Sequence, residues 1–198
     1  MSWTVQSKLR YDNPAKEIKL GKPSQAARNR FATREERALL MECAANDPTR
    51  FILYCTFWAG MRFNEVVEAR PEWFNIKGGY VTIQKTDTFT PKNKKNRTVP
   101  LSADFKAFLK TYGLKSPYML EPTVTKGDAD YRYDFRKPWE KVLSAAAKKA
   151  NEELEKEGKL PTADFSWITP HVARYTFASL LAQQGTSIYK IAQWILIA

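Results

Sequence analysis

The chain has few of the residues that build metal and thiol chemistry: its 198 residues include one histidine and two cysteines. Two cysteines are too few for a disulfide framework, and a single histidine cannot complete a zinc site with them. Cys43 and Cys55 both lie in apolar helical patterns, which predicts buried free thiols in a reducing compartment. Any chemistry is therefore expected to proceed without a protein-bound metal.

Long hydrophobic runs are also missing. No stretch approaches the ~20 apolar residues of a membrane helix, and no signal-peptide core follows Met1. Acids are outnumbered, with 21 Asp and Glu against 32 Lys and Arg, for a net charge of +11. Because these bases are interleaved with acids and aromatics, the expected polyanion is nucleic acid rather than a membrane surface. We expect a cytoplasmic location.

The pattern of turns and apolar residues predicts a mainly helical domain that follows a polar arm. Residues 1–32 are basic, contain Pro14 and Pro23, and have little periodicity, which predicts an arm or linker. Residues 33–36 fit a capping box that begins a helix, and an apolar helix begins at 47 and ends at Gly60. A long helix is predicted near 137–157. Short strands are predicted at 73–76, 80–84 and 97–100.

A second group of signals lies near the C-terminal end, in Thr169-Pro170-His171-Val172-Ala173-Arg174. Thr169 can cap a helix, and Pro170 suits its first turn because the missing N–H would be unpaired there. The i, i+3 spacing predicts His171 and Arg174 on one helix face, where two donors can converge on one anionic group.

An arginine also follows the apolar helix, in Gly60-Met61-Arg62-Phe63-Asn64-Glu65. An arginine in a buried turn needs an anionic partner, because its charge cannot be removed by deprotonation. Glu65 can hold the Arg62 guanidinium. The simpler interpretation is an ordinary Arg–Glu helix pair that contributes only tenths of a kcal/mol.

Residues 90–101 form a basic segment that ends in a strand. It reads Thr-Pro-Lys-Asn-Lys-Lys-Asn-Arg-Thr-Val-Pro-Leu, and Lys85 lies shortly before it. A lysine at such a turn can reach a DNA groove and protonate a leaving oxygen. The alternative is a solvated edge turn whose lysines prevent strand pairing.

Taken in order, these segments resemble the catalytic domain of the tyrosine recombinases (phage integrases). The family pattern is Gly-x-Arg-x-x-Glu, a lysine hairpin that leads into Arg and Val-Pro-Leu, and then His-x-x-Arg-(His/Tyr)-Thr-Phe-Ala. The resemblance covers roughly 33–194. It implies an α+β fold, mainly helical with a small three-stranded antiparallel sheet. Residues 1–32 would be the remnant of a connection to a core-binding domain, and 33–198 a catalytic domain incomplete at its C-terminus.

The resemblance also implies roles for individual residues. Arg62 and Arg174 would clamp the non-bridging oxygens of the scissile phosphate, while His171 would assist proton transfer. The general acid would be Lys92, by its spacing to Arg97, with Lys85 as the alternative. Supporting and DNA-contacting roles are implied for Glu65, Tyr175, Lys94, Lys95 and Arg97. The implied partners are double-stranded DNA and further copies of the chain on DNA, as a family tetramer. A covalent phosphotyrosine conserves bond energy, so no cofactor is expected.

The match departs from the family after Trp194, where the chain reads Ile-Leu-Ile-Ala. The family's nucleophilic tyrosine lies further along, and neither Tyr175 nor Tyr189 fits its place. We therefore expect a domain that binds DNA for site-specific recombination or integration but is cleavage-defective as this chain stands. The alternative is a non-catalytic DNA-binding or regulatory module derived from an integrase, with the apolar residues 195–197 docking on a neighbouring subunit. A metal-dependent nuclease is disfavoured, because no compact acidic cluster stands out.

Overall fold

A computed structural model describes residues 30–91, 95–115, 117–126 and 129–195. The chain divides into two units, Met1–Arg30 and Phe31–Ala198. The predicted arm lies outside the described residues up to position 29, and so do residues 196 and 197 of the predicted docking tail. The account below concerns the second unit.

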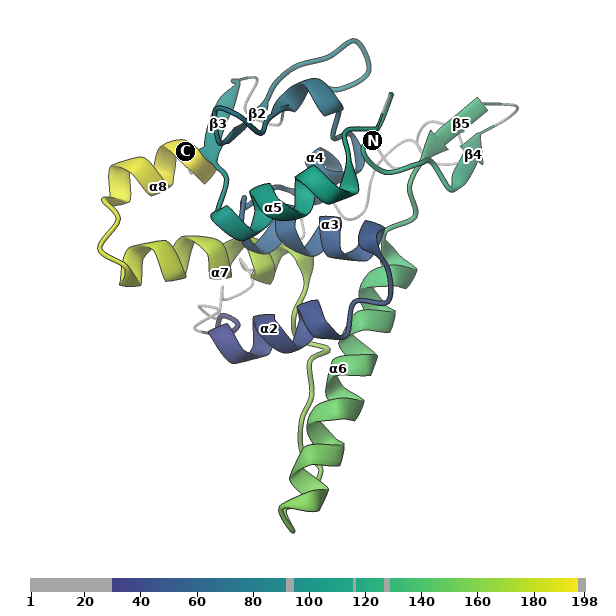
Figure 1. Cartoon of the computed structure of the whole chain (residues 1–198), viewed down its shortest axis with the longest axis vertical. Helices are drawn as coiled ribbons and strands as arrows, with labels where there is room; N and C mark the ends of the chain where they lie inside the picture. Colours follow the sequence, from purple (N-terminus) through teal and green to yellow (C-terminus); the bar gives the residue numbers. More distant parts are fainter. Residues whose placement is uncertain (1–29, 92–94, 116, 127–128, 196–198) are drawn as a thin grey trace, which may run out of the picture. The chain divides into compact units, whose positions relative to one another are not determined.

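Among the described residues of this unit, helices are the main elements, and two small sheets accompany them (Figure 1). The helices are α2 (Arg34–Glu42), α3 (Asp47–Phe57), α4 (Phe63–Val67), the 3₁₀ helix η1 (Pro71–Trp73), α5 (Ala103–Tyr112), α6 (Arg136–Lys156), α7 (Pro170–Gln183) and α8 (Ile188–Ile195). The strands are β1 (Phe74–Asn75), β2 (Tyr80–Ile83), β3 (Arg97–Pro100), β4 (Val124–Lys126) and β5 (Ala129–Arg132). The sheet β1-β2-β3 is antiparallel, which confirms the predicted fold class. The β4–β5 hairpin was not predicted.

Local side-chain hydrogen bonds begin the helices where the sequence predicts. Thr33 and Glu36 form the capping box of α2, with each side chain accepting from the other residue's main-chain N–H, at 3.1 and 2.8 Å. At the start of α7, Thr169 accepts from the main-chain N–H of Val172 at 3.2 Å, and Pro170 occupies the first turn. These two caps fix where α2 and α7 begin.

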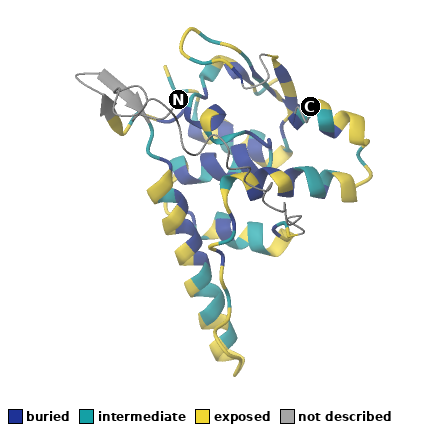
Figure 2. Ribbon diagram, turned by 180° about the vertical axis from the view of Figure 1, so that it is seen from behind, coloured by how far each residue is buried: buried dark blue, intermediate teal, exposed yellow. Residues whose placement is uncertain are grey.

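Helix α3 lies at the centre of the core and contacts α2, α4, α6 and α7. Phe51, Ile52, Leu53 and Cys55 of this helix are fully buried, and the ring of Phe51 stacks on Tyr112 of α5 at 5.3 Å. Figure 2 shows the buried residues concentrated around α3, whereas the far end of α6 is largely exposed. An apolar helix surrounded on all sides explains why α3 is hydrophobic around most of its circumference.

The three-stranded sheet determines which of its side chains face the core. Strand β3 pairs with β2 in the register Val81↔Val99 and Ile83↔Arg97. Val81, Ile83, Arg97 and Val99 are buried, whereas Thr98 is exposed, because successive side chains of a strand point to opposite faces. The register therefore places the Arg97 side chain on the inner face of the sheet.

The structure also bears on the predictions about the cysteines and about membrane-spanning helices. Cys55 is buried, but Cys43 is only half-buried, and both thiols are free. In the part of the chain that the structure describes, no helix combines the length and the apolar character needed to cross a membrane.

Candidate active site

The first arginine box follows the turn that ends α3. Gly60 adopts a φ of +56°, and Arg62 precedes α4 as its N-cap residue. The main-chain N–H of Arg62 donates to Glu65 Oε2 at 2.6 Å, and its Nη1 donates to Glu65 Oε1 at 3.2 Å. Glu65 is 1% exposed. The predicted contact between Arg62 and Glu65 is therefore present, with a buried carboxylate rather than a solvated helix pair.

Arg174 connects the second arginine box to the first. It lies on the buried side of α7, and its guanidinium donates to the main-chain carbonyls of Gly60 and Ile195. Gly60 and Arg174 are 114 positions apart in the chain. The tertiary structure thus brings α7 and the end of α8 to the turn that carries Arg62.

The charges around Arg174 show how tightly the cationic groups converge. Burial, then the charges of Arg97 and Arg62, lower the pKa of Arg174 to about 9, while Glu65 and Tyr175 act in the opposite direction. The Glu65 carboxylate forms hydrogen bonds with the guanidinium groups of Arg62 and Arg97, and its charge also acts on Arg174. Such a cluster carries surplus positive charge in a partly desolvated place, where an anionic group would stabilise it.

The structure corrects the predicted role of Arg97. DNA contact was expected, but the Arg97 side chain is 1% exposed and forms a bidentate ion pair with Glu65. The reason is the register of β3, which directs Arg97 inward opposite Ile83. The alternation of side chains along the strand indicates this inward direction, because Arg97 lies on the same face as the apolar Val99.

His171 and Tyr175 lie together on the exposed side of α7. Their ring centroids are 4.9 Å apart, and the rings meet edge to face at 89°. His171 is exposed and Tyr175 is 51% exposed, whereas Arg174 is buried. The first turns of α7 therefore carry His171 at the surface and Arg174 in the interior, although their spacing predicted a common face.

The candidate general acids lie on the connection between β2 and β3. Lys85 is exposed two positions after the end of β2, and its main-chain N–H donates to Asn96 Oδ1 at 3.3 Å. Lys95 is exposed just before β3. Lys92 and Lys94 lie outside the described residues, so the choice between Lys85 and Lys92 stays a prediction.

This connection reaches the first arginine box. A cavity of about 330 Å³ is lined by Arg62, Phe63, Asn64, Glu65, Phe89 and Thr90. Thr90 precedes the lysine-bearing segment by two positions. The main chain that leads to Lys92 therefore borders the same cavity as Arg62.

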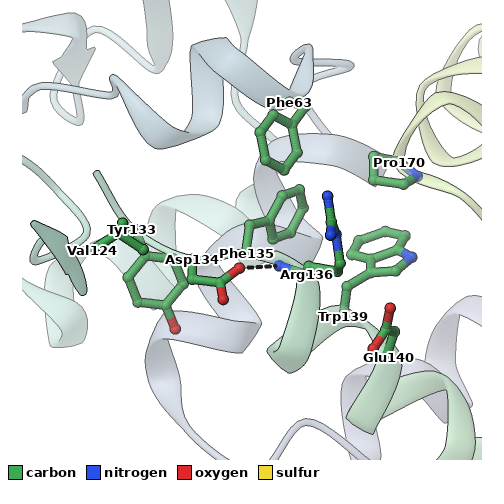
Figure 3. Close-up of a pocket in the computed structure, with 9 residues that line it drawn as sticks. All are labelled: Phe63, Val124, Tyr133, Asp134, Phe135, Arg136, Trp139, Glu140 and Pro170. Carbon is green, nitrogen blue, oxygen red and sulfur yellow. Dashed lines mark hydrogen bonds between the residues drawn. The ribbon is translucent and has the colours of Figure 1, made fainter. Parts of the chain in front are cut away.

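A second cavity, of about 380 Å³, lies beside the site (Figure 3). Phe63 of α4 and Pro170 of α7 both line it, together with Phe135, Arg136 and Trp139 near the start of α6. Phe63 is the neighbour of Arg62 in sequence, and Pro170 is the neighbour of His171. The shared cavity is an independent sign that the two boxes lie side by side.

The described ranges contain no group of three or more His, Cys, Asp or Glu side chains placed to hold a metal ion. Sequence reasoning missed three contacts that define the site: the Arg97–Glu65 pair and the carbonyls of Gly60 and Ile195 that accept from Arg174. Any residue can supply a main-chain carbonyl, so no sequence motif could have predicted the two carbonyl contacts of Arg174.

A mainly helical domain with a small antiparallel sheet, in which two arginine boxes converge, has the fold of a tyrosine recombinase catalytic domain. The model of the phage integrase family matches residues 30–195, and the chain belongs to this family.

Three solved structures illustrate the likeness. An integrase from mycobacterium phage Brujita has a TM-score of 0.61 at 16% identity, over 98% of this chain and 57% of that one. XerA recombinase has a TM-score of 0.60 at 18% identity, over 89% and 57%. The Tn1549 transposon integrase in complex with circular intermediate DNA has a TM-score of 0.57 at 16% identity, over 85% and 59%.

At these identities the likeness shows the fold alone. This chain spans less than two thirds of the length of each of the three proteins. A search of curated proteins gives no match.

Proposed function

We propose that the chain is a catalytic domain for site-specific DNA recombination or integration, of the phage or mobile-element type, which binds duplex DNA and holds the scissile phosphate. The observation that carries this proposal is the hydrogen bond from Arg174 to the carbonyl of Gly60, two positions before Arg62. It brings the guanidinium group of Arg174 to the turn that carries Arg62, from a box 114 positions away in the chain. A phosphodiester matches their charge, and the similar Tn1549 integrase was solved in complex with DNA.

In the proposed mechanism, Arg62 and Arg174 donate hydrogen bonds to the two non-bridging oxygens of one phosphate. These bonds strengthen as charge develops on the five-coordinate phosphorus, which is how preorganised donors lower the barrier. Burial and the neighbouring cations lower the Arg174 pKa to about 9, so a bound phosphate relieves the repulsion between these guanidinium groups. His171, exposed on α7, moves or holds a proton at the phosphate oxygens.

The departing 5′-oxygen receives its proton from a lysine on the β2–β3 connection, Lys92 or Lys85. Lys94 and Lys95 of the same segment contact the DNA backbone, and further copies of the chain assemble on the DNA. These assignments rest on the position of Thr90 at the Arg62 cavity, on the exposure of Lys85 and Lys95, and on the net charge of +11.

The covalent step needs a tyrosine, and no tyrosine follows Tyr189 in these 198 residues. Tyr189 is 80% exposed on α8, and Tyr175 packs edge-on against His171. We propose that the 198-residue polypeptide binds and holds the phosphate without cleaving the strand. The second candidate function is a non-catalytic DNA-binding or regulatory module derived from an integrase, for which a basic domain of this fold with a net charge of +11 would suffice.

DNA binding is tested by fluorescence anisotropy with a 30-base-pair duplex at increasing salt. Between about 50 and about 200 mM salt, we expect the affinity to fall by roughly tenfold or more, because each neutralised phosphate releases counterions. Arg62→Gln and Arg174→Gln should each weaken binding, whereas the control Arg50→Gln removes only an exposed pair with Asp47. An affinity that does not change with salt contradicts the proposal.

Cleavage is tested separately with a nicked duplex that traps a covalent protein–DNA adduct. We expect no adduct from the 198-residue polypeptide. An adduct that disappears in Tyr175→Phe or Tyr189→Phe would show that one of these tyrosines is the nucleophile and would overturn the cleavage-defective assignment.

A further inference from the structure

We propose that Arg97 is a positioning residue, which holds Glu65 so that Glu65 in turn directs the Arg62 guanidinium toward the phosphate. The inner face of the β-sheet would then set the geometry of the first arginine box. The inference rests on the proposed function, because Arg62 is the group that meets the phosphate.

The contact between Arg97 and Glu65 is a buried, bidentate ion pair. Arg97 Nη1 donates to Glu65 Oε1 at 2.6 Å, and Arg97 Nη2 donates to Glu65 Oε2. The two side chains are 1% and 2% exposed. The planar fork of a guanidinium matches a carboxylate in both position and angle, so the pair fixes the orientation of the carboxylate as well as its place.

Each carboxylate oxygen of Glu65 is shared between the two arginines. Oε1 accepts from Arg97 Nη1 and from Arg62 Nη1, and Oε2 accepts from Arg97 Nη2 and from the main-chain N–H of Arg62. A rotation of Glu65 away from Arg97 therefore disturbs the main chain and the side chain of Arg62 together. Glu65 transmits the position of β3 to the N-cap of α4.

Arg97 also keeps Glu65 ionised. Burial raises the pKa of Glu65, but hydrogen bonds and charge from Arg97, the main-chain N–H of Arg62 and the charge of Arg174 bring it below its ordinary value. Only an ionised carboxylate accepts at both oxygens without presenting a donor. Loss of the Arg97 guanidinium thus removes the main group that keeps Glu65 ionised and able to accept all four hydrogen bonds.

The place of Arg97 in the fold gives this pair a second consequence. Arg97 begins β3, directly after the segment that carries Lys92, Lys94 and Lys95. One ion pair therefore anchors the end of the lysine-bearing connection to the first arginine box. An ion pair that only stabilised the fold would be buried in the same way. The experiment therefore has to report on the orientation of the Arg62 side chain.

The direct readout is the Nε–Hε NMR signal of Arg62 in the DNA-free protein, assigned by its loss in Arg62→Gln. In Arg97→Lys, which keeps the charge but loses the fork, we expect this signal to shift and broaden while the folded spectrum persists. The matched control is Arg50→Lys, which alters an exposed arginine–carboxylate pair. An unchanged Arg62 signal in Arg97→Lys overturns the proposal.

A double-mutant cycle on affinity for the same 30-base-pair duplex gives the second readout. Arg62→Gln should weaken binding by about tenfold, in line with the loss of a charge-assisted hydrogen bond. Arg97→Lys should weaken binding by roughly fivefold in the wild-type background and by less than about twofold in Arg62→Gln, because coupled residues are not additive. Additive effects overturn the proposal.

Two outcomes keep this test separate from the proposed function. If the wild-type protein binds no DNA, the proposed function fails, while the Arg62 signal still decides whether Arg97 positions it. If Arg97→Lys does not fold, the pair Glu65→Gln with Arg97→Met removes both buried charges together. The Arg62 signal should broaden in that folded double variant, and an unchanged signal there overturns the proposal.

Discussion

Arg174 donates a hydrogen bond to the main-chain carbonyl of Gly60, which lies two positions before Arg62. This contact makes the conformation of a glycine part of the proposed phosphate site. Gly60 has a positive φ, and a Cβ at this position would lie 2.5 Å from the ring of Phe177 on α7. The second arginine box therefore packs closely on the first only because residue 60 has no side chain.

Replacement of Gly60 tests this close packing. Gly60→Ala should lower the free energy of unfolding by about 2 kcal/mol or more, because backbone strain adds to the clash with Phe177. Gly185→Ala is the matched control. The φ of Gly185 is also positive, at +79°, but a Cβ added there would meet nothing within 4 Å. Its free energy of unfolding should therefore fall by only about 1 kcal/mol, from backbone strain alone. Urea denaturation measures both, and equal losses would contradict the role of close packing.

Neutralisation of Glu65 should be strongly destabilising. Glu65→Gln leaves the buried Arg97 without its ionised partner, and the loss of one partner of a buried pair is expected to lower stability by about 3 kcal/mol. Asp47→Asn removes an exposed pair with Arg50 and should change stability by less than about 1 kcal/mol. A loss in Glu65→Gln no larger than that of the control, in urea denaturation, would show that the buried pair contributes little.

The same carboxylate should make stability depend on acid pH. The folded-state pKa of Glu65 lies below its ordinary value of 4.5, so the unfolded chain binds its proton more tightly. Glu65 therefore stabilises the fold above pH 4.5, and this contribution declines as pH falls through 4.5 toward the folded-state pKa. Thermal melts should be recorded between about pH 3 and 7, the range in which carboxyl groups titrate. The melting temperature should fall less steeply with decreasing pH in Glu65→Gln than in the wild type. Parallel curves would mean that other carboxyl groups account for the acid sensitivity.

Thr176 connects α7 to the segment just before α2. The main-chain N–H of Ala32 donates to Thr176 Oγ1 at 3.0 Å, and both residues are fully buried. Thr176→Val keeps the shape but leaves this N–H unpaired, so we expect a loss of about 1–3 kcal/mol. Thr176→Ser retains the hydroxyl and is the control for hydrogen bonding. Hydrogen exchange should show faster exchange at Ala32 in Thr176→Val only, and slow exchange in both variants would refute the assignment.

The sequence predictions that the structure confirms depend on interactions between residues close together in the chain. The capping box at Thr33, the cap at Thr169 and the strand at 97–100 depend on neighbours within a few positions, so the sequence contains the whole signal. The β4–β5 hairpin was missed, because residues 124–132 combine charged residues and a glycine without clear alternation. Short strands of this kind depend on their partner more than on their own composition.

The sequence by itself determined the family, the helical class with its small sheet, and the residue types of the site, because ordered motifs and helix caps are written in consecutive residues. Only the tertiary structure decided that Arg97 points inward to Glu65, and that Arg174 donates to the carbonyls of Gly60 and Ile195. Those contacts depend on strand register and on the packing of α7 and α8 against the end of α3. Such long-range relations are set by the burial of a whole core, which no local pattern specifies.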